Sequence, residues 1–244
     1  MRHQPNLQLA DVGAAWDPDP SAGEWIAPLL GPFGQRLDHA VPRGYERYAV
    51  VPVPEWDDPD ANPLSWLETL LDVLEPITGD QPVHVGYWDG WGWMYRHGED
   101  AATAPGMSAL VARTTGWRAR LARLLPRPAR RLIPPGRQLR EACAAAQAEL
   151  GAARVEHPAA APLQLPHRDY YLWTGPLRSA TVFERWPDPP SLIWPEDRSW
   201  FVGAPIYTRE AAVGGDATLI DAVLARPELH ARAAQPETVL DIDD

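Results

Sequence analysis

Lysine is missing from this chain, and cysteine is nearly missing. All 22 basic residues among its 244 residues are arginines, and Cys143 is the single cysteine. One cysteine excludes an intramolecular disulfide. Cys143 lies in an alanine-rich stretch, so we interpret it as a small apolar residue, with a nucleophile as the alternative. The absence of lysine is typical of GC-rich coding, so an arginine here says little about selection for bidentate binding.

Long apolar runs and catalytic motifs are also missing. No stretch of about 18 apolar residues occurs, which predicts no transmembrane helix. Residues 1–20 contain no apolar signal region, and we expect a cytoplasmic protein that does not bind membranes. Phosphate-binding loops, nucleophile elbows and zinc-binding or dinucleotide-binding motifs are not found. These absences predict no catalytic residues, no metal and no cofactor.

Acidic residues outnumber basic ones, and they are unevenly distributed. The net charge is −11, which disfavours nucleic acid as a partner of the whole chain. Residues 101–140 contain no acid, and nine arginines fall between Arg113 and Arg140. This segment is interpreted as a spacer, with alternatives of a basic surface for RNA, membrane or an acidic partner, and of an intramolecular contact with the acidic body.

The apolar content, 45% of the residues including 12 tryptophans, is enough to build a core. Apolar and β-branched runs predict short strands, and Asp89-Gly90 predicts a hairpin turn leading to a partner strand over 91–95. Helical spacing of leucines after Asn62-Pro63, and of apolar residues after Asp216, predicts two amphipathic helices. The order predicts an α+β fold with an antiparallel or mixed sheet. The predicted strands cover 45–53, 82–88, 169–174, 191–194, 199–207 and 211–213.

Composition divides the chain into segments. Residues 1–23 are polar and proline-rich and predict a loose arm. Residues 24–96 and 163–232 are expected to form one α+β domain, interrupted by an Ala/Arg/Pro-rich insertion over 97–162 that is helical or flexible. Residues 233–244 are predicted to form a solvated acidic tail.

Three clusters mix aromatic and charged residues, the composition expected of a binding site. Each also has a structural interpretation. The first would be core packing around a turn, and the second a buried Arg–Asp pair or a polar turn at the start of a strand. The third would be a solvated turn in which Arg198 pairs with an acid elsewhere. His84 is expected to join a site with His167 if their strands pair. The candidate binding residues are Trp88, Asp89, Trp91 and Trp93 in the first cluster, Arg168 and Asp169 in the second, and Glu196, Asp197 and Arg198 in the third.

These clusters, taken in order, resemble a family of uncharacterised conserved proteins from high-GC (actinobacterial) bacteria. The likeness covers about residues 31–95 and 163–230 and implies domain limits rather than an activity. A weaker likeness to the SUKH immunity and scaffold proteins lies in the spacing Pro42-x-x-Tyr45-x-x-Tyr48 and in the α+β order. The family likeness rests on the tracts from Val41 to Ala49, Trp88 to Trp93, Arg168 to Leu177, Trp194 to Trp200 and Val213 to Ile220.

Two functions follow as hypotheses. The first is a non-enzymatic module that binds another protein, in an immunity-like or regulatory role, because tryptophan and arginine dominate binding hot spots. The alternative is a small-molecule-binding protein or an enzyme. Its pocket would be floored by Trp88 or Trp93 and surrounded by the charged residues of the second and third clusters.

Overall fold

The computed structural model describes residues 9–54, 64–90, 161–166, 168–182 and 189–242. These residues belong to one compact unit, made of Met1–Gly90 and Pro158–Asp244. The predicted strand over 91–95, the run from Arg113 to Arg140 and residues 97–160 of the predicted insertion lie outside the described residues.

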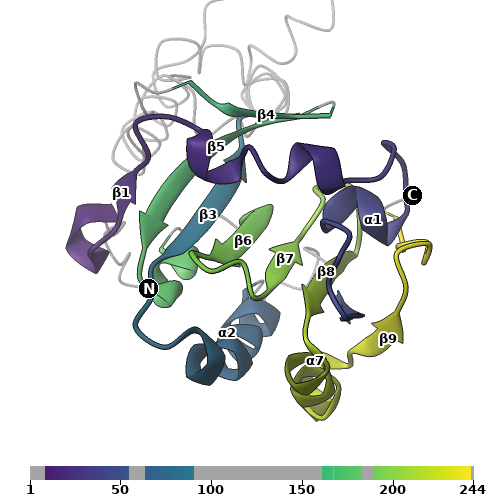
Figure 1. The fold of residues 1–244 in the computed structure, drawn as a ribbon. Helices are drawn as coiled ribbons and strands as arrows, with labels where there is room; N and C mark the ends of the chain where they lie inside the picture. The colour runs from purple at the N-terminus through teal and green to yellow at the C-terminus, as the bar shows by residue number, and fades with distance from the viewer. Residues whose placement is uncertain (1–8, 55–63, 91–160, 167, 183–188, 243–244) are drawn as a thin grey trace, which may run out of the picture. The chain divides into compact units, whose positions relative to one another are not determined.

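The described strands form one antiparallel sheet, which confirms the α+β fold. Its order is β1-β5-β3-β6-β7-β8-β2-β9, and β4 pairs with β5 (Figure 1). The sequence left open whether the sheet was antiparallel or mixed, and the structure decides for antiparallel. The strands are β1 (Ala15–Trp16), β2 (Arg47–Pro52), β3 (Val83–Trp88), β4 (Leu163–Leu165), β5 (Arg168–Gly175), β6 (Leu192–Pro195), β7 (Phe201–Gly203), β8 (Glu210–Gly215) and β9 (Arg232–Ala234).

Two amphipathic helices, α2 (Ser65–Thr78) and α7 (Ala217–Leu224), contact each other on one side of the sheet (Figure 1). The leucines of α2 that the spacing predicted to be apolar contacts are fully buried. Asp216 caps α7, the helix predicted after it, because its Oδ1 accepts a hydrogen bond of 2.8 Å from the Leu219 amide. Within the described residues, no helix combines the length and the apolar character that a membrane span requires.

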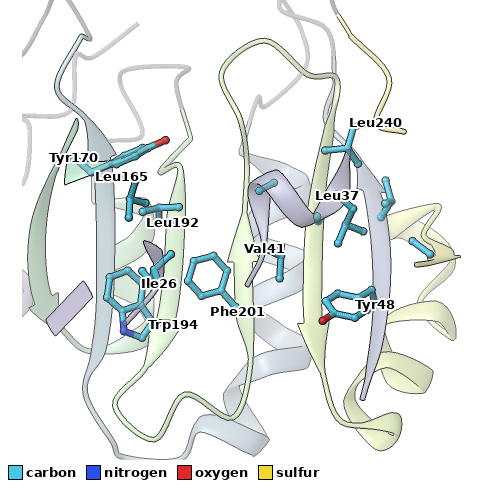
Figure 2. Close-up of a cluster of buried hydrophobic side chains, with 14 of the residues drawn as sticks. Ile26, Leu37, Val41, Tyr48, Leu165, Tyr170, Leu192, Trp194, Phe201 and Leu240 are labelled. Carbon is cyan, nitrogen blue, oxygen red and sulfur yellow. The ribbon is translucent and has the colours of Figure 1, made fainter. Parts of the chain in front are cut away.

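The segment before β2 covers the other face of the sheet. It contains a 3-10 turn (Ala27–Leu29) and the one-turn helix α1 (Leu37–Ala40). Ile26, Leu37 and Val41 from this segment are fully buried in one apolar cluster with side chains from seven strands (Figure 2). Trp194 and Phe201 lie in this cluster with nearly parallel rings, 5.8 Å apart. Further 3-10 turns occur at Leu9–Val12, Ser21–Gly23, Leu177–Thr181 and Pro227–Leu229.

Residues 9–23, part of the predicted loose arm, are packed against the sheet in the structure. β1 pairs with β5, the Trp16 ring meets the Trp173 ring edge-on at 5.5 Å, and the Asp17 amide donates to the Leu172 carbonyl at 3.0 Å. Residues 9–23 therefore belong to the domain. Their partners lie more than 150 positions along the chain, so no local pattern could indicate the pairing.

The predicted acidic tail, residues 233–244, is not fully solvated either, because part of it pairs with the sheet and packs in the core. β9 pairs with β2, and Leu240 is 2% exposed within the apolar cluster. One predicted strand is shorter than expected: β7 covers three residues of the predicted run over 199–207, which turns at Pro205. β7 pairs with the following strand, β8, in antiparallel register.

Candidate functional site

β3 positions the candidate residues, because it lies between β5 and β6. Trp88 at the end of β3 is opposite Tyr170 of β5, and Val83 at its start is opposite Pro195 of β6. Five residues of extended strand span about 17 Å. The structure therefore separates the first two predicted clusters from the third, and one small molecule would not contact both ends. Trp91 and Trp93 lie outside the described residues.

At one end of β3, an arginine is surrounded by three aromatic rings. The Arg168 Cζ atom lies 4.8 Å from the ring centre of Tyr207, 5.3 Å from that of Trp88 and 5.8 Å from that of Phe33. These are cation–π distances. We name this cluster the Phe33 surface, made of Phe33, Trp88, Arg168 and Tyr207. Phe33 is 46% exposed, so the cluster reaches solvent.

Hydrogen bonds and ring contacts hold the Phe33 surface in place. The Tyr207 hydroxyl donates to the Gly34 carbonyl at 3.0 Å and lies 2.9 Å from His39 Nδ1. The His39 ring meets the Phe33 ring edge-on at 4.9 Å. Burial raises the pKa of Tyr207, against a smaller lowering by Arg168, so the phenol stays protonated near neutral pH. These contacts fix the Tyr207 and His39 side chains against Gly34 and Phe33.

Asp89 and Asp169, the acids of the first two clusters, meet through their backbones. The Asp89 amide donates to the Asp169 carbonyl at 3.0 Å, which closes the end of the β3–β5 pair. Asp169 is opposite Gln164 of β4. The guanidinium of the neighbouring Arg168 stacks on the aromatic rings described above. The structure therefore brings Trp88, Asp89, Arg168 and Asp169 together, because the end of β3 pairs with the start of β5.

At the opposite end of β3, His84 lies in a continuous hydrogen-bonded network. Its Nε2 is 2.7 Å from Glu196 Oε2, and its Nδ1 is 2.8 Å from Thr174 Oγ1. The Thr174 hydroxyl donates its single proton to Asp17 Oδ1 at 2.7 Å. Thr174 must therefore accept from Nδ1–H, and the Glu196 carboxylate accepts from Nε2–H. This arrangement of acceptors favours the form of His84 in which both ring nitrogens carry protons, the imidazolium.

The predicted site combining His84 and His167 is not supported by the strand register. Although β3 and β5 pair, the residue opposite His84 is Thr174, whereas the Trp88 end of β3 faces the start of β5. His167 itself lies outside the described residues. His84 instead stacks on Trp194, with ring centres 5.2 Å apart and planes inclined by 24°.

Burial lowers the pKa of His84, but the hydrogen bonds and charges of Asp17 and Glu196 raise it by more, so it lies above its ordinary value. Because the pKa of His84 is higher in the folded than in the unfolded protein, the charged histidine stabilises the fold. This stabilisation is complete at pH values below the unfolded pKa of about 6.5, and it is lost as the pH rises through the folded pKa. We therefore expect the wild type to exceed His84→Gln in free energy of unfolding by more at pH 5.5 than at pH 9. Urea unfolding at both pH values measures this difference.

Glu196→Gln is the companion variant for the His84 test. It keeps a hydrogen-bond acceptor near Nε2 and removes the charge, so it should remove part of the pH dependence. An equal wild-type advantage over His84→Gln at pH 5.5 and pH 9 would contradict a charged His84.

The third predicted cluster forms the turn between β6 and β7. Burial raises the pKa of Asp197, but hydrogen bonds from Ser199 and Gln81 lower it by more, and the result lies below its ordinary value. Arg198 has a left-handed backbone with a φ of 57°. Its guanidinium lies 4.9 Å from the ring centre of Trp25. Asp197 therefore stabilises the turn, and Glu196 pairs with His84. Arg198 stacks on the Trp25 ring.

Sequence reasoning missed Phe33, Tyr207, Asp17 and Thr174 as site residues. Phe33, Asp17 and Tyr207 lie in segments outside the three predicted clusters. Thr174 lies near the end of the strand that begins with the second cluster, and only the β3–β5 register places it opposite His84. Within the described ranges, no three His, Cys, Asp or Glu side chains are grouped as metal ligands.

Comparison with known proteins gives no match among family models, curated proteins or solved structures. The resemblance noted from the sequence motifs stays a prediction. The two ends of β3 carry the contacts that bear on function.

Proposed function

We propose that this protein is a non-enzymatic binding module that contacts another protein through the Phe33 surface. The observation that carries the proposal is the assembly of Arg168 with three aromatic rings from separate segments, with Phe33 46% exposed. Tryptophan, tyrosine and arginine are the residue types that contribute most to protein–protein affinity.

Pre-ordering strengthens this proposal. Binding costs conformational entropy when flexible side chains are fixed, and that cost is smaller for side chains that are already packed. Tyr207 is held by Gly34 and His39, and Arg168 is held by the rings it stacks on. An immunity-like or regulatory role fits a rigid surface of this kind.

The alternative is a small-molecule-binding protein or an enzyme, and it would rest on the opposite end of β3. In the polar cluster there, both ring nitrogens of His84 are already hydrogen-bonded to Glu196 and Thr174, and the residue is 7% exposed, so the ring presents no unpaired nitrogen to a substrate. The geometry therefore favours the protein-binding role.

Site-specific photo-crosslinking tests the proposal. Benzoyl-phenylalanine at position 33, introduced in the host cells, should capture one protein at a reproducible mass. The matched control is position 77, because Ile77 is similarly exposed, at 39%, but lies on α2. Equal capture at both positions would contradict the proposal.

Variants of the Phe33 surface then test its energetics against the captured partner. Phe33→Ala and Arg168→Ala should each weaken the affinity at least about tenfold, as hot-spot truncations do. Ile77→Ala should change it by less than about twofold. Unchanged affinity in both Phe33→Ala and Arg168→Ala would exclude this surface as the binding site.

A further inference from the structure

Residues 236–242 begin with a turn at Pro236-Glu237 and lie between two other parts of the chain, to which isolated bridges join Val239 and Ile242. On one side, Leu37 N donates to Thr238 O at 2.8 Å, Asp38 N to Pro236 O at 3.0 Å and Leu240 N to Gln35 O at 2.8 Å. On the other side, Arg209 N donates to Asp241 O at 2.9 Å, Asp241 N donates to Glu210 Oε2 at 2.9 Å, and Thr208 pairs with Ile242. We name the two flanking stretches, 35–38 and 208–210, the strand slot.

One side chain anchors residues 236–242. Leu240 is 2% exposed and belongs to the apolar cluster that contains Leu37 (Figure 2). Val239 is 60% exposed, and the Glu237 side chain is 70% exposed. A segment with few buried apolar contacts and a largely exposed surface opens more easily than the core of a domain.

The strand slot selects ligand chemistry in three ways. Its backbone groups hydrogen-bond to the backbone of residues 236–241, and recognition by strand addition uses backbone hydrogen bonds of the same kind. The site of Leu240 selects one aliphatic side chain. The Arg36 guanidinium, which pairs with Asp38 at 3.0 Å, also lies 3.6 Å from Glu237 and is 43% exposed, so it favours an acid three residues before the aliphatic one.

We propose that residues 236–242 are an exchangeable strand, and that the strand slot binds an extended acidic segment of a partner protein with a leucine-like anchor. The chain's own strand competes for the slot at a high effective concentration, so the partner binds the closed form weakly. The strand slot shares no residue with the Phe33 surface, and either proposal can fail while the other holds.

Hydrogen exchange on the wild-type chain tests the opening. The amides of Leu37, Leu240 and Arg209 should exchange at least 100-fold faster than that of Val85, which lies in the middle of β3. Equal protection at these positions would show that the strand leaves only on global unfolding and would overturn the proposal. This measurement uses the wild-type chain, so it tests the opening of residues 236–242 even if a variant fails to fold.

A labelled peptide tests binding in trans. The probe is acetylated Pro-Glu-Thr-Val-Leu-Asp-Ile, with fluorescein attached, measured by fluorescence anisotropy. Leu240→Ala weakens the internal strand and should bind the probe at least tenfold more tightly than the wild type. Val239→Ala, a change at an exposed position of the same strand, should bind it as the wild type does.

Peptide variants complete the test. Replacing the probe's leucine by alanine, or its glutamate by glutamine, should weaken binding to Leu240→Ala. No binding of the probe to Leu240→Ala, or an equal gain in Val239→Ala, would overturn the proposal. A dimer of the wild type that exchanges this strand between copies would assign the strand slot to a second copy and overturn a separate partner.

Discussion

Gly203→Ala is expected to lower the free energy of unfolding by about 3 kcal/mol, the upper end of the usual cost of overpacking. A Cβ atom at position 203 of β7 would lie 2.1 Å from the Ala40 carbonyl oxygen and 2.8 Å from the Ala40 carbonyl carbon. These are backbone atoms of α1, so no rotamer change relieves the clash, and α1 must move off the sheet. Urea unfolding followed by tryptophan fluorescence measures the loss.

Gly34→Ala is the control for this prediction. A Cβ atom at position 34 meets nothing nearer than the Pro32 carbonyl oxygen at 3.9 Å, and its backbone φ is not in the left-handed region. The change should therefore stay within about 0.5 kcal/mol of the wild type. A similarly small effect of Gly203→Ala would show that α1 does not pack against β7.

Trp194→Ala is expected to cost about 3–5 kcal/mol, as for other buried aromatic truncations. Trp194 is 1% exposed and stacks on Phe201 on one side and on His84 on the other. Its loss leaves a large cavity and removes the ring that supports the imidazolium. We expect both a lower urea midpoint and a smaller difference in stability between pH 5.5 and pH 9.

Phe33→Ala is the matched control, because it truncates an aromatic ring that is 46% exposed. It should cost less than about 1 kcal/mol. That result would also show that its effect on partner binding does not come from unfolding. A loss for Trp194→Ala no larger than that for Phe33→Ala would contradict the place of Trp194 in the core.

Local patterns predicted the elements of this fold well. The leucines of α2 and the Asp216 cap of α7 act within a few residues, so their effect is visible in the sequence. Turn residues and β-branched runs likewise placed β2, β3, β5, β6 and β8 close to their observed bounds. These signals report the shape of single segments.

Pairings between distant segments could not be predicted. β1 joins β5 across more than 150 residues, and residues 236–242 meet residues 35–38 across about 200. β1 and residues 236–242 are each held by a few backbone hydrogen bonds and one or two apolar contacts. So few apolar positions do not produce a strand pattern in the sequence. Composition therefore predicted a loose arm and a solvated tail.

The sequence by itself determined the α+β class, the two amphipathic helices, most strands and the residue types from which a binding surface is made. Only the tertiary structure decided which of those residues meet. The β3 register places Arg168 beside Trp88 and puts Glu196 beside His84 at the far end. Phe33 and Tyr207 join Arg168 because the segment before β2 folds over the sheet. The physical reason is that side-chain patterns act over a few residues, whereas strand register and sheet order depend on contacts between distant segments.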